Sequence, residues 1–295
     1  MTSRWLISVP VWGERCVDIF CAVGLPALQR AVDFLQARRG VDARLVIHTD
    51  QADRVRGATS LAIEARPVPA GARDFDSMSQ GHREVMALGL LGDVVVPLTA
   101  DTVISEAGLD YCAEVLENPQ LRVVLCAVPR ALQQGRVPDI GSARALMAWA
   151  WKNRHPLVRD CEWPRGLASN LSRMFFERDG SVITRQCLPH PLAVKIDGRA
   201  LRFTPTVDAN LMQCFDRSEL HVTVNCRQLA LVELSPASKD DGRATKTIEQ
   251  RLAEYAVVIP DPLQRWCLGH KIVLVGEPRD CGDDEVVSKI MSLGG

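Results

Sequence analysis

Short groups of polar and aromatic side chains follow three apolar runs of this chain, and their types suit the binding of a polar ligand. The apolar runs cover residues 5–9, 43–47 and 93–97, and each has the length and composition of a buried strand. In open parallel sheets, ligands bind beyond the carboxyl ends of the strands, above all where the strand order reverses. The candidate residues are therefore Pro10, Val11, Trp12 and Gly13 after the first run, Thr49 and Asp50 after the second, Thr99 and Asp101 after the third, and His82 before the third.

Asp50, Asp101 and His82 each have a second interpretation. Aspartate is a favoured helix N-cap because its side chain accepts a hydrogen bond from a free backbone N–H, and both aspartates could simply cap the helices that follow them. His82 could lie on the solvent-facing side of its helix. The sequence leaves these interpretations open beside the ligand-binding one.

The elements that would position these residues alternate between strand and helix. Beyond the three runs named above, strands are predicted at residues 61–68 and 122–128, and helices at 17–37, 77–91 and 106–117. Alternation of this kind predicts an α/β fold, in which a mostly parallel sheet carries helices on both faces.

The second half of the chain predicts a mixed α+β arrangement. It has a helical stretch at residues 143–151, strand-like stretches at 187–196, 221–224 and 229–234, and helical stretches at 247–255 and 263–268. We expect residues 1–130 to form the α/β half, residues 131–236 to complete the same domain, and residues 237–295 to form a C-terminal helical extension.

Composition and charge restrict the class of protein. The 295 residues include 35 basic and 36 acidic side chains, so the chain lacks the single-sign excess that drives binding to nucleic acid. No stretch approaches the ~20 apolar residues of a membrane span, and no signal-peptide core is seen, so we expect a cytoplasmic protein. The ten cysteines are scattered without a CxxC pair, which predicts reduced side chains used as small hydrophobes.

Several nucleotide-binding and catalytic motifs are missing from the sequence. The first run is not followed by GxGxxG, and the chain has neither a GxxxxGK[ST] loop nor a GxSxG nucleophile turn. A nucleotide-binding sheet without a phosphate-binding glycine loop must hold a diphosphate with a metal ion or with basic side chains. The sequence therefore predicts one of these two solutions.

The order and spacing of several segments resemble bacterial GT-A-like glycosyltransferases of the family 2 type. These segments are ISVPVWG, HTD and VVVPLTADTVIS in the first half, and HPLVRDCEWP, LPHPLAVKI, FTPTVDANL and LHVTVNCRQLALVELS in the second. The resemblance runs from residue 5 to residue 236. It implies that residues 1–130 bind a nucleotide sugar and that residues 131–236 face the acceptor, which is a saccharide, a glycolipid, a protein or a small molecule.

The resemblance also implies roles for the candidates on the donor side. The loop of residues 10–13 would hold the nucleotide base, and Thr49 and Asp50 would bind the base or the ribose. His82 would face the diphosphate. The triplet that ends at Asp101 takes the place of the DxD motif, whose carboxylates hold a divalent cation. Only Asp101 is acidic there, so it would give Mn²⁺ or Mg²⁺ a single carboxylate contact.

On the acceptor side, the resemblance implies that Asp208 is the base that takes the proton of the acceptor hydroxyl. It implies that His190 and His221 contact a metal ion or a phosphate. The family pattern is more acidic just after this aspartate, and Ala209 and Asn210 depart from it. The departure implies a changed acceptor or a weakened enzyme.

Two other functions stay open. A nucleotidyltransferase would use a similar sheet, but it would need a glycine-rich basic loop where residues 11–15 supply one glycine and one arginine. A non-catalytic GT-A-like protein that binds a nucleotide or a partner would explain the incomplete DxD motif and the neutral residues after Asp208. Slow hydrolysis of a sugar nucleotide without acceptor would distinguish an enzyme from such a binding protein.

Overall fold

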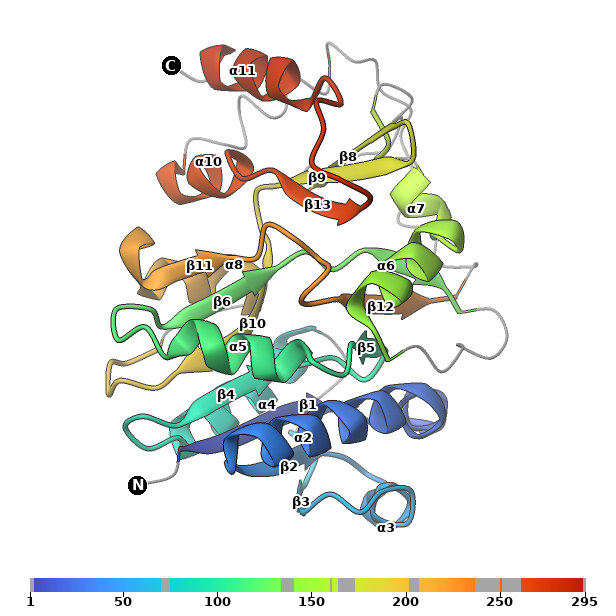
Figure 1. Ribbon diagram of the computed structural model, residues 1–295. Coiled ribbons are helices and arrows are strands. Elements are labelled where there is room, and N and C mark those ends of the chain that lie inside the picture. Colours follow the sequence, from blue (N-terminus) through green and yellow to red (C-terminus); the bar gives the residue numbers. More distant parts are fainter. Residues whose placement is uncertain are drawn as a thin grey trace.

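The computed structural model describes residues 3–69, 75–133, 141–159, 161–163, 173–201, 207–236, 250 and 261–293. The helix predicted at residues 247–255 lies outside these ranges, apart from residue 250. Figure 1 shows the described elements as ribbons and arrows.

A seven-stranded sheet forms the centre of the molecule, in the order β11-β6-β10-β4-β1-β2-β3. Neighbouring strands are parallel except at β10, which is antiparallel to both β4 and β6. The strands are β1 (Arg4–Pro10), β2 (Asp42–His48), β3 (Ile63–Arg66), β4 (Val94–Pro97), β6 (Val123–Cys126), β10 (His190–Lys195) and β11 (Leu220–Val222). The strand order reverses beside β1, because β2 and β3 lie on one side of it and β4 lies on the other.

Helices cover both faces of this sheet. In β1, Trp5, Ile7 and Val9 pack on the side of α2 (Leu25–Arg39) and α5 (Gly108–Leu116). Leu6 packs on the opposite side, with α4 (Phe75–Leu88). Figure 1 shows α2 and α5 in front of the sheet and α4 behind it. Burial on both faces explains the continuous apolar runs of the strands, and the predicted mostly parallel α/β fold is confirmed.

The helix predicted at residues 17–37 is divided in the structure. It consists of α1 (Glu14–Ile19), a π-helical turn (Phe20–Gly24) and α2. At the end of the turn, Gly24 packs against the backbone that follows β4, and a Cβ there would lie 3.1 Å from the carbonyl oxygens of Ala100 and Thr102. The helical region therefore supports the loop that carries Asp101. A further short helix in this half is α3 (Ala52–Arg56).

Two smaller three-stranded sheets are present beside the central one. One has the order β5-β12-β7, with β5 (Thr102–Ile104), β12 (Leu231–Ser235) and β7 (Arg130–Leu132). The other has the order β13-β9-β8, with β13 (Ile272–Val275), β9 (Ser181–Gln186) and β8 (Arg173–Arg178). The accompanying helices are α6 (Ala143–Lys152), α7 (Pro156–Arg159), α8 (Val207–Leu211), α10 (Pro262–Leu268) and α11 (Asp283–Leu293), with 3-10 turns at Met212–Cys214 and Arg217–Glu219. Figure 1 shows the β13-β9-β8 sheet, α10 and α11 at the end of the molecule far from β3.

Parts of the second half differ from the prediction. The strand predicted at residues 187–196 begins only at His190. The region 237–295, predicted as helical, also contains β13, which pairs antiparallel with β9. The hairpin of β8 and β9 is absent from the sequence prediction, although its turn contains an Asp-Gly pair, which is a recognisable sequence signal of a hairpin. Both residues of this pair, Asp179 and Gly180, have positive φ, at 49° and 73°.

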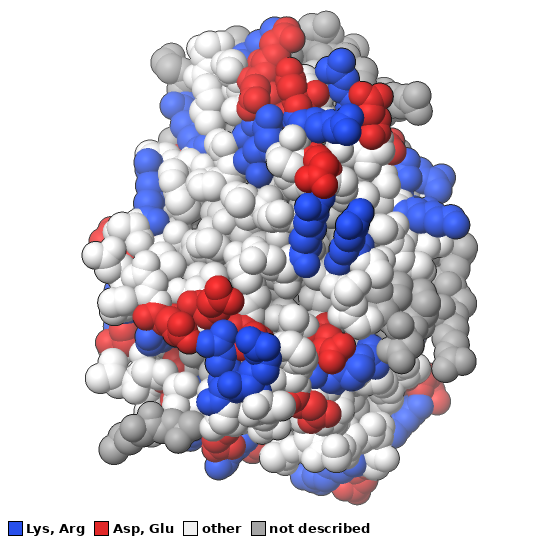
Figure 2. Space-filling model, viewed as in Figure 1, with Lys and Arg blue, Asp and Glu red and all other residues white. Residues whose placement is uncertain are grey.

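The described residues include no helix that is long and apolar enough to cross a membrane. The ten cysteines all lie in the described residues, and none of them forms a disulfide there. On the face drawn in Figure 2, basic and acidic side chains lie side by side rather than in separate fields of one sign.

Candidate functional site

A cavity of about 600 Å³ opens beyond the carboxyl ends of β1 and β4. One wall consists of the segments that follow these two strands together with part of α4. The other wall includes residues of β7, β8, β9 and β12 from the two smaller sheets. The cavity therefore lies where the strand order of the central sheet reverses, which is the usual ligand position in open α/β sheets.

The cavity brings together many of the residues selected from the sequence. Those that line it are Pro10, Val11, Trp12, His82, Thr99, Asp101 and His190. Four other candidates lie outside the lining: Gly13, Thr49, Asp50 and His221.

Asp50 supports the loop after β1 instead of lining the cavity. Its carboxylate accepts hydrogen bonds from the backbone N–H of Gly13 at 3.3 and 3.4 Å, where φ of Gly13 is +77°. The N-cap position of α3 is Gln51, and no side-chain capping bond forms there. The capping interpretation of Asp50 is therefore wrong. The neighbouring Thr49 hydroxyl accepts a hydrogen bond from Gln51 N at 3.1 Å, which shapes the turn after β2.

Asp101 lies on the cavity wall in the loop between β4 and β5. The element that follows is a strand, so the capping interpretation is wrong for this residue too. Its carbonyl oxygen accepts a hydrogen bond from Leu234 N at 2.8 Å. This bond fastens the loop after β4 to β12.

His82 is buried, and the solvent-facing interpretation of this residue is wrong. Only 3% of its surface is exposed, and that surface belongs to the lining of the cavity. Its Nδ1 lies 2.8 Å from Oγ of Ser8 in the centre of β1. The imidazole is therefore held at a fixed position on the cavity wall.

Gly81 allows α4 to pack closely enough to place His82 there. A Cβ at Gly81 would lie 3.0 Å from Nδ1 of His48 and 3.2 Å from Cγ of Pro10. His48 is buried, and its Nε2 lies 2.9 Å from Oε2 of Glu84, also on α4. These contacts dock α4 against the ends of β1 and β2.

The two histidines proposed from the second half have different surroundings. Nε2 of His190 donates a hydrogen bond to the carbonyl oxygen of Pro97 at 3.0 Å, which fixes the tautomer because a carbonyl can only accept. His221 lies away from the cavity, and its Nε2 is 3.0 Å from the Tyr111 hydroxyl. Burial, followed by the nearby His270, lowers the pKa of His221 below its usual value. His221 is thus a half-buried histidine of β11, outside the cavity lining.

Asp208 lies in α8, whose first residue, Val207, lines the cavity. The side chain of Asp208 lies outside the described part of the structure. Its predicted role as the base therefore stays a prediction.

The cavity also contains charged residues that the sequence analysis missed. Arg15, Arg130 and Arg173 line it, together with Glu233. Arg130 and Glu233 form an ion pair, in which Nη2 donates to Oε2 at 3.0 Å and Nε lies 2.9 Å from Oε1. Nη1 of Arg173 donates to the Val128 carbonyl oxygen at 2.8 Å. Arginine side chains gathered in one cavity favour an anionic ligand. The Arg130–Glu233 pair joins residues 103 positions apart, so no local sequence signal reveals it.

The side chains predicted to bind a metal ion are separated in the structure, because His221 lies outside the cavity that Asp101 and His190 line. Asp101, His190 and His221 do not form a metal-ligating group in the described residues, where the one group of three is Asp280, Asp283 and Asp284. Among the described residues, the cavity therefore offers a cation no group of three such side chains.

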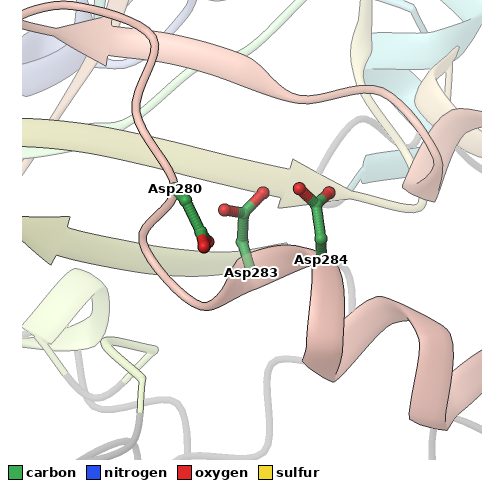
Figure 3. Close-up of side chains that lie close together, drawn as sticks. All are labelled: Asp280, Asp283 and Asp284. Atoms are coloured by element: carbon green, nitrogen blue, oxygen red, sulfur yellow. The ribbon is translucent and has the colours of Figure 1, made fainter.

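The acidic group near the C-terminus has a structural explanation. Figure 3 shows Asp283 and Asp284 at the start of α11 and Asp280 in the preceding loop. Arg185 donates to Asp283 at 2.8 Å and also pairs with Asp284, and Lys271 donates to Asp284 at 2.8 Å. These contacts compensate the acidic charge and fasten α11 to β9.

The fold and the cavity define an α/β protein with a cavity at the strand-order reversal of a mostly parallel sheet. Neither a protein-family model nor a curated protein matches the chain. Among solved structures, S. aureus TarS 1–349 in complex with UDP-GlcNAc aligns with a TM-score of 0.45 and 12% identity, over 99% of this chain and 72% of that chain. The same protein in complex with UDP aligns with a TM-score of 0.33 and 14% identity, over 46% of this chain and 38% of that chain.

A 4-diphosphocytidyl-2C-methyl-D-erythritol synthase aligns with a TM-score of 0.30 and 14% identity, over 48% of this chain and 68% of that chain. At these identities and TM-scores, the likeness assigns neither a family nor an activity to this chain.

Proposed function

We propose that this chain is a glycosyltransferase that takes its sugar from a nucleotide-sugar donor bound beyond β1 and β4. The observation that carries the proposal is the position of the cavity, which gathers the segments after both strands at the strand-order reversal. Its volume of about 600 Å³ suits a small-molecule ligand. The resemblance of the same segments to GT-A-like glycosyltransferases supports the proposal, and the expected cytoplasmic location is part of it.

In this proposal, the donor lies against the wall formed by β1, β4 and α4. The nucleotide base stacks on Trp12 beside Pro10 and Val11, because an indole ring offers a flat apolar surface. Gly13 and Asp50 act indirectly, through the hydrogen bond that holds this loop, and Thr49 acts through the bond that shapes the turn after β2. The diphosphate lies nearer to His82, Thr99 and Asp101, with its charge compensated by arginines of the cavity.

The proposed reaction is a direct displacement at the anomeric carbon of the donor sugar. The acceptor hydroxyl oxygen forms a bond to that carbon, and the bond from the carbon to the diphosphate breaks with its electron pair on the diphosphate. Asp208 is the proposed base for the hydroxyl proton. The acceptor enters along the wall of β7, β8, β9 and β12, and its class is open among saccharides, glycolipids, proteins and small molecules.

Thermal unfolding with a panel of nucleotides tests the proposal. A ligand that binds only the native state stabilises it by about 2.7 kcal/mol at 100 times its Kd. We expect one of UDP, GDP, CDP and TDP to raise Tm clearly, and CMP to raise it less. Trp12→Ala should reduce the shift, whereas Trp266→Phe, in α10 and outside the cavity lining, should preserve it. If none of these nucleotides shifts Tm, the proposed donor site is wrong.

Repeating the panel with and without Mn²⁺ tests the predicted cofactor. Because Asp101 offers one carboxylate, Mn²⁺ or Mg²⁺ would be held chiefly by the donor phosphates and water. An equal Tm shift with EDTA and with Mn²⁺ indicates that nucleotide binding relies on the protein side chains.

One observation favours a second function, that of a non-catalytic nucleotide-binding protein. The DxD position retains a single carboxylate, and the described cavity residues include no group of three metal-ligating side chains. Such a protein would bind the nucleotide but leave the sugar nucleotide intact. Release of UDP from UDP-GlcNAc without acceptor separates the two functions. Release of pyrophosphate from a nucleoside triphosphate and a sugar phosphate would instead identify a nucleotidyltransferase.

A further inference from the structure

We propose that Ser8 is a positioning residue for His82. Its hydroxyl holds the imidazole in the tautomer with the proton on Nε2, which donates a hydrogen bond to the diphosphate of the donor. The diphosphate part of this inference rests on the proposed function, whereas the Ser8–His82 pair rests on contacts within the chain.

Ser8 places a hydroxyl in the centre of an apolar strand. It lies between Ile7 and Val9 in β1, and 0% of its surface is exposed. A buried hydroxyl without a hydrogen bond costs roughly 1–3 kcal/mol, so a serine at such a position needs a partner. That partner is Nδ1 of His82, 2.8 Å from Oγ.

The burial of Ser8 determines the direction of this hydrogen bond. A serine hydroxyl has one proton to donate, and at this position it cannot turn toward solvent. Among the described residues, Nδ1 of His82 is the group with which this hydroxyl forms its side-chain hydrogen bond, so we assign Ser8 as the donor and Nδ1 as the acceptor. A neutral imidazole that accepts at Nδ1 carries its proton on Nε2. The strand thereby selects one tautomer of the histidine.

The position of His82 makes this tautomer useful for binding a diphosphate. The ring shares the cavity wall with the end of β1 and with Thr99 and Asp101 after β4. At the DxD position the first carboxylate is replaced by Thr99, so protein donors must compensate part of the diphosphate charge. A hydrogen-bond donor held in place at a site with little water binds an anion more strongly than a mobile one. Gly81 holds α4, and hence His82, against the sheet.

Two variants of the same shape isolate the hydroxyl of Ser8. Ser8→Thr keeps the hydroxyl, and Ser8→Val has the same branched side chain without it. The probes are the nucleoside diphosphate that shifts wild-type Tm most, with UDP as first choice, and the matching nucleoside. We expect Ser8→Val to bind UDP about 10-fold more weakly than Ser8→Thr, because a hydrogen bond to a charged group loses its oriented donor. Uridine, which has no phosphate, should bind both variants equally.

NMR of the imidazole nitrogens gives a second readout that needs no nucleotide. Two-bond ¹H–¹⁵N spectra distinguish the two neutral tautomers, and His82→Gln assigns the signals of His82 by their loss. Wild type and Ser8→Thr should show Nε2–H with Nδ1 as acceptor, and Ser8→Val should show a mixture. If Ser8 acted on stability alone, this pattern would not change between the variants.

The outcomes of these experiments test the Ser8–His82 hydrogen bond independently of the proposed function. An Nδ1–H tautomer in the wild type overturns the Ser8–His82 assignment. Equal Kd of UDP for Ser8→Thr and Ser8→Val overturns the diphosphate role. If the wild type binds none of the nucleotides, the diphosphate role fails together with the proposed function, while the NMR spectra still decide the pair. If the branched variants do not fold, Ser8→Ala compared with wild type gives the same two readouts.

Discussion

Two carboxylates are candidates for the base that takes the acceptor proton in the proposed reaction, and their surroundings differ. Glu233 lies on the cavity wall, where its Oε2 accepts from Arg130 at 3.0 Å and its Oε1 accepts from Ser235 Oγ at 3.2 Å. Both carboxylate oxygens of Glu233 therefore accept hydrogen bonds from within the chain. The ion pair of Arg130 and Glu233 joins β7 to β12. Asp208 follows Val207, which lines the same cavity. We expect Asp208 to act as the base and Glu233 to hold Arg130 in place.

Matched carboxylate-to-amide variants test this division of roles. Asp208→Asn should lower the hydrolysis of the sugar nucleotide in water, measured as release of the nucleoside diphosphate, by about 100-fold or more, because general-base catalysis contributes about 10² to 10⁴-fold. Glu233→Gln should lower it by less than about 10-fold, since the amide oxygen still accepts from Arg130. Both variants should keep the nucleotide-dependent Tm shift. The reverse order of the two losses would assign the base to Glu233.

At the scale of elements, Asp93 fastens the amino ends of β1 and β4. Its carboxylate accepts from the Arg4 side chain at 2.5 and 3.1 Å and from Leu90 N at 2.7 Å. Arg4 also donates to the carbonyl oxygen of Leu88, the last residue of α4, at 3.3 Å. Burial raises the pKa of the Asp93 carboxyl, but the hydrogen bonds from Arg4 and Leu90 outweigh it, so the pKa lies below its usual value.

The lowered pKa of Asp93 predicts a stability contribution that depends on pH. Because the folded pKa lies below the unfolded value of about 3.9, the contribution is fully present above that value and is lost as pH falls through the folded pKa. Asp93→Asn should reduce the free energy of unfolding by about 1–3 kcal/mol at pH 7, and the difference from wild type should shrink below about pH 4. Urea unfolding at pH 7 and below about pH 4 measures this difference in the free energy of unfolding.

An exposed aspartate gives the control for this experiment. Asp42 pairs with Arg44 at 2.9 Å on the surface, so Asp42→Asn should change the free energy of unfolding by less than about 1 kcal/mol. A loss for Asp93→Asn that stays constant from pH 7 to pH 3 would contradict the assigned role of the carboxylate charge.

The sequence predicts the parallel strands better than the hairpin of β8 and β9, for a physical reason. β1 and β2 extend one residue beyond each end of the predicted runs 5–9 and 43–47, because both faces of these strands are buried and the apolar pattern is local. In β9, Thr184, Arg185 and Gln186 are also buried. Arg185 is buried because it meets Asp283, 98 residues away, which no local pattern can show.

The same distinction applies to the candidate site. Trp12 and Asp101 could be predicted because strand ends are visible in the sequence and mark the ligand edge of a parallel sheet. Arg130, Arg173 and Glu233 come from strands of the smaller sheets, so their position depends on pairing between distant segments. The contact of His82 with Ser8 likewise joins residues 74 positions apart.

At the scale of the whole molecule, the cavity joins the central sheet to the two smaller sheets. Backbone hydrogen bonds hold each wall, one of them within the central sheet and one across this junction. Val11 N donates to the His48 carbonyl oxygen at 2.9 Å, and Leu234 N donates to the Asp101 carbonyl oxygen at 2.8 Å. A ligand in the cavity that contacts both walls must oppose the opening of both sets of hydrogen bonds.

Amide hydrogen exchange tests this consequence. With the nucleoside diphosphate that binds at 100 times its Kd, exchange of Val11 and Leu234 should slow by up to about 100-fold, because opening then requires release of the ligand. Amides of α11 that exchange by local fraying should keep their rates, since this helix packs on the β13-β9-β8 sheet rather than on the cavity. Trp12→Ala at the same nucleotide concentration is the control, and its protection should be weaker on both walls. Protection of Val11 alone would mean that the nucleotide contacts only the wall of the central sheet, and that the strands β7, β8, β9 and β12 remain free to receive the acceptor.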